Sequence, residues 1–226
     1  MRLLFSVLFS LCLMSVGFGQ SKTLPSFTSI STSGSVKVEL VKGDQSKAEY
    51  TIVKGSADDL IIEVTGGELD VKIKSKNSFW NRSETKANVT VYYQTLNEID
   101  CSAGSSISSN SEIKASVMDI DASSGAKCQV KVQSDGIKVS TSSGSKVTVS
   151  GTTGSATYDA SSGARIDAVN LVASDADADV SSGGSISLFA SKKLKAEASS
   201  GGNIKYRGNP ASTNIDSGMS GSISSF

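Results

Sequence analysis

The sequence predicts an all-β protein, a parallel β-helix of roughly 20 residues per coil preceded by an irregular, partly antiparallel β region. Three observations predict this fold: an internal repeat, a composition rich in serine and glycine, and alternation of apolar and polar residues between the glycines. Serine and glycine are poor helix formers, and 21 of the 226 residues are glycine. This composition excludes an all-α fold.

The repeat begins at residue 99 and is a short phrase centred on Ser-Gly. The clearest copies read IDCSAGSSI, IDASSGAKC, VSTSSGSKV, YDASSGARI, ADVSSGGSI and AEASSGGNI, with a weaker last copy, IDSGMSGSI. The copies end at Ile107, Cys128, Val147, Ile166, Ile186, Ile204 and Ile223. A unit this short excludes helix-pair repeats, and it lacks the leucine-rich pattern, so the period indicates a β-helix.

Apolar residues recur at fixed positions around the central glycine, and polar residues stand between them. The position three after the glycine is occupied by the apolar residues that end the copies, and the position five before it by Ile99, Ile120, Val139, Tyr158, Ala178 and Ala196. This period of two is typical of strands with one buried face. We therefore expect these columns to point inward, with Ser-Ser-Gly forming the corner and its glycine taking a positive φ.

Residues 20–98 contain strand-like runs of less regular spacing. Thr65-Gly66-Gly67 lies between two such runs and predicts a hairpin. The segment from Ile30 to Val36 repeats the Ser-Gly phrase, so we expect residues 20–98 and the regular coils of 99–226 to form one continuous unit.

Residues 1–19 are predicted to be a signal peptide, because a positive start precedes an apolar stretch of 14 residues from Leu3 to Val16 and small residues follow it. This stretch is too short for a transmembrane helix. We expect an exported protein that is periplasmic, on the outer surface or secreted.

Several motifs occur in a characteristic order: FTSISTSGSVKVELVKGD, GGELDVKIK, VTVYYQTLNEIDCSAGSSI, and then the Ser-Gly corners. Together they resemble the head GIN domain family, which also carries the label putative autotransporter adhesin. The resemblance spans roughly residues 24–226. It implies an exported β-helical protein and brings no catalytic or binding residues with it.

Catalysis is not expected. The chain has no histidine, which excludes Ser-His-Asp and Cys-His nucleophilic sites and zinc sites that need imidazole. Coil lengths vary little, so no coil carries an insertion able to roof a catalytic groove. The sequence predicts a non-catalytic interaction module that binds a glycan or an envelope protein through its flat outer face. The alternative is a carbohydrate-processing enzyme on a short β-helix.

Acidic residues form a column four positions before the glycine: Asp100, Asp121, Asp159, Asp179, Glu197 and Asp216, with Ser140 among them. We expect water, with Lys127, Lys146 and Arg165 across the corner, to neutralise it, so no metal and no cofactor is expected. The alternative is a cation such as Ca²⁺. Within DADAD, the residues Asp175, Asp177 and Asp179 are the best local candidates for binding one.

Two further features are candidates for binding or cross-linking. Phe79 and Trp80 lie in a polar loop, where they suit sugar stacking, a subunit contact or a cap for the solenoid end. Cys101 and Cys128 fall in inward columns, where a disulfide and two buried thiols are both compatible with the pattern.

Charge gives no expectation of nucleic-acid binding, because 22 basic residues balance 22 acidic ones and no basic run appears. The last coil ends in Ile223 and Phe226 without a polar cap, so a homo-oligomer formed through this end is expected.

Overall fold

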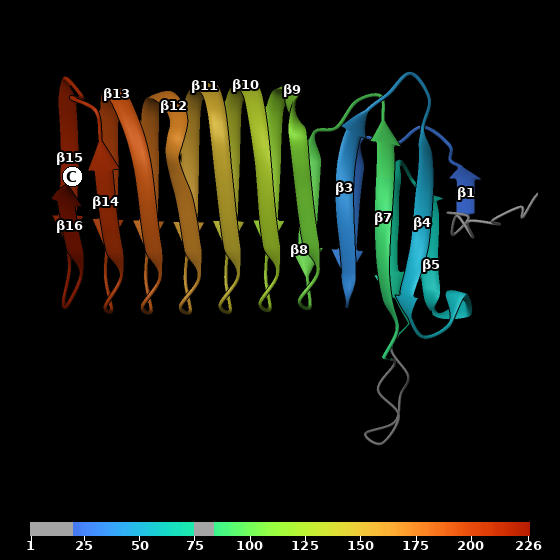
Figure 1. Ribbon diagram of the computed structural model, residues 1–226. Helices are drawn as coiled ribbons and strands as arrows, with labels where there is room; N and C mark the ends of the chain where they lie inside the picture. The colour runs from blue at the N-terminus through green and yellow to red at the C-terminus, as the bar shows by residue number, and fades with distance from the viewer. Residues whose placement is uncertain (1–19, 75–83) are drawn as a thin grey trace, which may run out of the picture.

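The computed structural model describes residues 20–74 and 84–226, and within them the chain is nearly all β. Figure 1 shows the strands side by side as the rungs of one continuous rod. The N-terminal elements are β1 (Gln20–Thr23), β2 (Ser29–Ser33), β3 (Val36–Lys42), β4 (Lys47–Lys54), the 3-10 helix η1 (Ala57–Asp59), β5 (Leu60–Thr65), β6 (Glu68–Ile73) and β7 (Lys86–Tyr93). The repeats supply β8 (Glu98–Ser102), β9 (Ser106–Ala122), β10 (Lys127–Thr141), β11 (Lys146–Ala160), β12 (Arg165–Val180), β13 (Ser185–Ala198), β14 (Asn203–Arg207), β15 (Ser212–Ser217) and β16 (Ser222–Ser225).

Each long strand from β9 to β13 bends once and contributes to two layers. The layer that we call the first sheet runs β1-β4-β7-β3, continues through the first halves of β9 to β13, and ends in β14 and β16. The layer that we call the second sheet runs β5-β6-β2-β8, continues through the second halves of β9 to β13, and ends in β15. The solenoid is therefore flat, with two broad outer faces.

Parallel pairing in register confirms the predicted β-helix. Cys128 lies beside Val147, Val147 beside Ile166, and Ile166 beside Ile186, so equivalent positions of successive repeats stack. These four side chains are buried, as predicted for the inward columns. The core is thus a set of apolar ladders, in which each side chain packs against its counterparts one coil away.

The Ser-Gly corners form a row along one edge of the rod, at the bottom of Figure 1. Both Ser143 and Gly144 have a positive φ, 53° and 71°, which is the pattern of a type I′ turn. The sequence predicted a positive φ for the glycine, whereas the same conformation at the serine was not anticipated. The Gly144 N–H donates to the Ser162 carbonyl in the next corner at 3.1 Å. Hydrogen bonds between coils therefore hold this strained turn in place.

A second, wider bend joins the two halves of each long strand. In β11 it contains Gly151, whose φ is 117°. A Cβ atom at this position would collide with the carbonyl oxygen of Val132 on the neighbouring coil. Glycine is required here because the backbones of adjacent coils approach too closely for a side chain.

The N-terminal part is mixed, as predicted. β5 and β6 form an antiparallel hairpin through Gly66 and Gly67, both with positive φ. β2 stacks in parallel on β8, with Ile30 beside Ile99, so this part starts the same two-layer body. β4 pairs antiparallel with β1 and β7. The predicted signal peptide lies outside the described residues.

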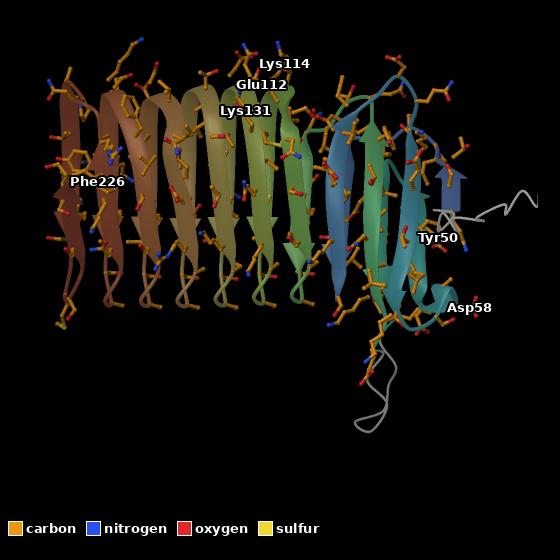
Figure 2. All side chains as sticks on the ribbon, in the orientation of Figure 1. Tyr50, Asp58, Glu112, Lys114, Lys131 and Phe226 are labelled. Carbon is orange, nitrogen blue, oxygen red and sulfur yellow. The ribbon has the colours of Figure 1, made fainter. Side chains whose placement is uncertain are left out.

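The other end of the rod is β15 and β16. All residues of β15 are exposed, and Met219 in the last corner is 90% exposed. Figure 2 labels Phe226 at this end, where the Arg207 guanidinium lies 4.7 Å from its ring centroid. Over the described ranges, 20–74 and 84–226, none of the helical segments has the length and apolar character needed to cross a membrane.

Candidate functional site

The outer faces of the two sheets carry opposite charges, because outward residues alternate with the buried columns on every strand. The first sheet presents Lys37, Lys54, Lys86, Lys127, Lys131, Lys146, Arg165, Lys205 and Arg207, with fewer acidic residues such as Glu39 and Asp167. The second sheet presents Glu63, Glu68, Asp70, Glu98, Asp100, Asp119, Asp121, Asp159, Asp175, Asp177, Asp179, Glu197 and Asp216, with Lys72, Lys138, Lys193 and Lys195. A net charge of zero therefore conceals a basic face and an acidic face.

The predicted acidic column exists on the second sheet. Asp100 lies beside Asp121 and Asp159 beside Asp179, with Ser140 between the two pairs. These four carboxylates line a groove of about 460 Å³ beside the Ser-Gly corners. Strand pairing sets about 4.8 Å between neighbouring rungs, so the carboxylates repel one another.

Burial and repulsion both act on these carboxyl groups. Partial burial raises the pKa of Asp100, and the charge of Asp121 raises it further. Partial burial likewise raises the pKa of Asp159, where Asp179 adds to the effect and Lys138 opposes it. Asp100 and Asp159 therefore have a raised pKa and hold their protons more tightly than free aspartate does.

Asp175, Asp177 and Asp179 project from β12 on the outer side, while Ala176 and Ala178 between them are buried. The Lys195 ammonium lies 3.6 Å from the Asp177 carboxylate and 2.9 Å from Glu197, so a lysine already accompanies the middle aspartate. In the described part of the chain, no group of three or more metal-ligating side chains comes together. Cation binding by these aspartates stays a prediction.

The other predicted candidates divide between described and undescribed parts of the chain. Phe79 and Trp80 lie outside the described residues. Cys101 and Cys128 are buried free thiols, and the Cys101 sulfur lies 3.4 Å from the Lys127 carbonyl oxygen as a weak donor. Burial raises the pKa of both thiols, which keeps them protonated and unreactive.

Lys127, Lys146 and Arg165 do not neutralise the acidic column, contrary to our expectation. They lie on the first sheet, and within the described part of the chain none of them forms an ion pair with the acidic column. Lys138 and Lys195, which lie on the acidic face itself, partly neutralise the acidic column instead. The corner separates the two charge sets because it turns the chain from one face to the other.

A column of basic residues follows the first sheet instead, and we call it the basic column. Lys37 lies beside Ser106, Ser106 beside Lys127, and Lys127 beside Lys146. Arg165 follows Lys146 on the next rung. All four cationic side chains are exposed, and no ion pair to any of them is found within residues 20–74 and 84–226.

A groove of about 660 Å³ lies at the N-terminal end of the basic column, and we call it the lysine groove. Lys37, Lys86 and Lys127 line it, together with the exposed Val53 and backbone near the first corners. No acidic residue is among its lining residues. The sequence did not reveal this groove, because its lysines come from β3, β7 and β10.

Comparisons with known proteins agree with the fold. The family model described as "Putative auto-transporter adhesin, head GIN domain" matches residues 26–210. No curated protein matches the chain. Among solved structures, a Bacteroides fragilis protein described as a putative adhesin is 18% identical, with a TM-score of 0.81, over 92% of this chain and 95% of that one.

Two further solved structures match over the same shares of the chains. A Parabacteroides distasonis protein described as a putative lipid binding protein is 24% identical with a TM-score of 0.73, covering 92% of this chain and 95% of that one. A Parabacteroides merdae protein described as a putative adhesin is 17% identical with a TM-score of 0.70, again over 92% and 95%. At these identities the likeness concerns the fold alone.

Proposed function

The chain belongs to the head GIN domain family, described as putative auto-transporter adhesins, and we propose that it is an exported, non-catalytic binding module. Its working surface is a flat outer face of the solenoid, and its partner is a glycan or an envelope protein. Two proteins of the same fold are described as putative adhesins, which supports a role in binding rather than in catalysis.

The observation that carries this proposal is the regular repetition of polar side chains on flat faces. Successive coils place the same position of the repeat one rung apart, as Lys127, Lys146 and Arg165 illustrate. A partner with its own repeat can contact many rungs at once. Individually weak contacts then add up, because each additional contact on a rigid surface is intramolecular.

The test is a binding screen of the purified protein on an array of bacterial and host glycans and on isolated envelope proteins. Selective binding of any of these would support the proposal. A protein that binds nothing on the array and no envelope protein would refute it.

The screen also separates this proposal from a carbohydrate-processing enzyme on a short β-helix. Each polysaccharide that binds is incubated with the protein, and new reducing ends or unsaturated sugar ends are measured. We expect binding without cleavage. Cleavage of a bound polysaccharide would show that the protein is a carbohydrate-processing enzyme and not a non-catalytic binding module.

A further inference from the structure

The first sheet carries an uncompensated line of positive charge that the proposed function does not yet explain. The basic column runs along the rod axis, across the rungs, from Lys37 to Arg165. Four rung steps at the usual strand spacing give this line a length of about 19 Å. Like charges on neighbouring strands repel, so the bare column costs stability that an anionic partner would restore.

The column is narrow, which restricts the shape of the partner. The next outward column on the same sheet contains Glu39 and Asp167, two residues along the chain from Lys37 and Arg165. Between them stand the neutral residues Ser108, Gln129 and Thr148. A wide anionic surface, such as a bilayer, would meet these carboxylates, whereas a single extended chain would pass beside them.

The lysine groove gives the column a starting point. Three ammonium groups, from Lys37, Lys86 and Lys127, surround a concave region. Val53, 59% exposed, offers an apolar contact there, and Asn88 and Ser106 offer hydrogen bonds. Cations, amide and hydroxyl groups, and a small apolar surface together suit a sugar that carries a carboxylate.

We propose that the basic column and the lysine groove bind a linear acidic polysaccharide, one whose sugars carry carboxylate groups. An extended glycan advances by a distance similar to one rung for each sugar, so its carboxylates can meet the cations of the basic column, and the rung at Ser106 carries no charge. The groove holds one carboxylated sugar beside Lys86, and the chain continues past Lys146 to Arg165. This inference rests on the proposed function and names the partner and the face.

The test uses polygalacturonate, a polymer of one uronic acid, and measures its binding by biolayer interferometry at several salt concentrations. The variant Lys37→Ala/Lys127→Ala/Lys146→Ala removes three charges from the basic column. The control Lys138→Ala/Lys193→Ala/Lys195→Ala removes three charges from the acidic face. The two variants have the same net charge, so a difference in affinity between them reflects the position of the removed charges.

We expect the wild type to bind with an affinity that falls as salt rises. The basic-column variant should bind about tenfold more weakly, since three exposed charge contacts together contribute roughly one factor of ten. The control should bind at least as well as the wild type. Thermal melts should show both variants folded, because the substituted side chains are exposed, with the control slightly less stable than the wild type because it loses the lysines that offset the acidic column.

Three results would overturn the inference. These are no binding to polygalacturonate, equal losses in the two variants, and binding to duplex DNA or to anionic vesicles in preference to the uronate. If one of these results is obtained while a neutral glycan or an envelope protein binds equally to wild type and basic-column variant, this inference is refuted and the proposed function stands. Only the absence of every partner would refute both.

Discussion

Replacing Ile166 by aspartate perturbs the stacked core at its centre. The side chain is fully buried between Val147 and Ile186 on the neighbouring coils. Losing a buried isoleucine removes about 1.5–3 kcal/mol of hydrophobic stabilisation. The new carboxyl group must also be buried, and an unpaired buried carboxylate is far more costly than a protonated one.

The aspartate therefore folds in its protonated form, and its cost depends on pH. Protonating a group of pKa about 3.9 at pH 7 costs about 4 kcal/mol at 1.36 kcal/mol per pH unit. The folded pKa lies above the unfolded pKa, so the folded state holds the extra proton. The variant's unfolding free energy consequently falls as pH rises from about 4 toward 7.

The assay is urea unfolding followed by circular dichroism at pH 4 and pH 7, with Gln129→Asp as the control. Gln129 is exposed on the first sheet between two neutral neighbours, Ser108 and Thr148. We expect a total loss of about 6 kcal/mol at pH 7 for Ile166→Asp and less than about 0.5 kcal/mol for the control. The unfolding free energy of the wild type at both pH values is the reference from which each loss is calculated. If Ile166→Asp cost no more than Gln129→Asp, the assignment of inward and outward columns would be wrong.

Three smaller changes test other features. Tyr158 is buried, and its hydroxyl has no hydrogen-bond partner in the described residues. Tyr158→Phe should therefore raise the unfolding free energy by about 1 kcal/mol in urea titrations, with the exposed-hydroxyl change Tyr50→Phe as the control. A lower unfolding free energy for Tyr158→Phe would show that the hydroxyl has a partner. Burial first and neighbouring aspartates second raise the pKa of Asp100 and Asp159, so their contribution to stability is fully present below the unfolded pKa and is lost as pH rises through the folded pKa. Asp159→Asn should therefore stabilise the protein at pH 7 by on the order of 0.5 kcal/mol and by less at pH 4, and equal effects at both pH values in thermal melts would contradict the repulsion. Gly151→Ala should lower the unfolding free energy by about 1–3 kcal/mol, more than Gly163→Ala, whose Cβ would meet open space. If Gly163→Ala instead had the lower urea midpoint, the close approach of coils at the wide bend would be refuted.

The sequence predicted the coil accurately because its repeat is local and strict. Once Ile107, Cys128 and Val147 are aligned, the pleat of a strand decides which neighbours point inward. The hairpin at Gly66-Gly67 was predicted for the same reason, since two glycines between strand-like runs suit a type I′ turn. The positive φ of the residue before the corner glycine, Ala103 in the first corner and serine in the following ones, was missed, because neither residue has a special preference for that conformation.

The charge asymmetry was missed because it depends on which side of a corner each residue lies. Lys127, Lys146 and Arg165 were expected to neutralise the acidic column from across the corner. The two-sheet architecture assigns them to opposite faces. The lysine groove was beyond sequence reasoning, because Lys86 reaches it only through the parallel pairing of β7 with β3.

The most direct test of the account varies the length of the partner. Oligogalacturonides of increasing length are titrated into the wild-type protein by isothermal calorimetry at low salt. If a linear acidic glycan follows the rungs from Lys37 to Arg165, affinity should rise with each sugar until the chain spans about 19 Å, roughly four to five sugars, and should then level off. An affinity that does not change with length beyond a single sugar would contradict the account.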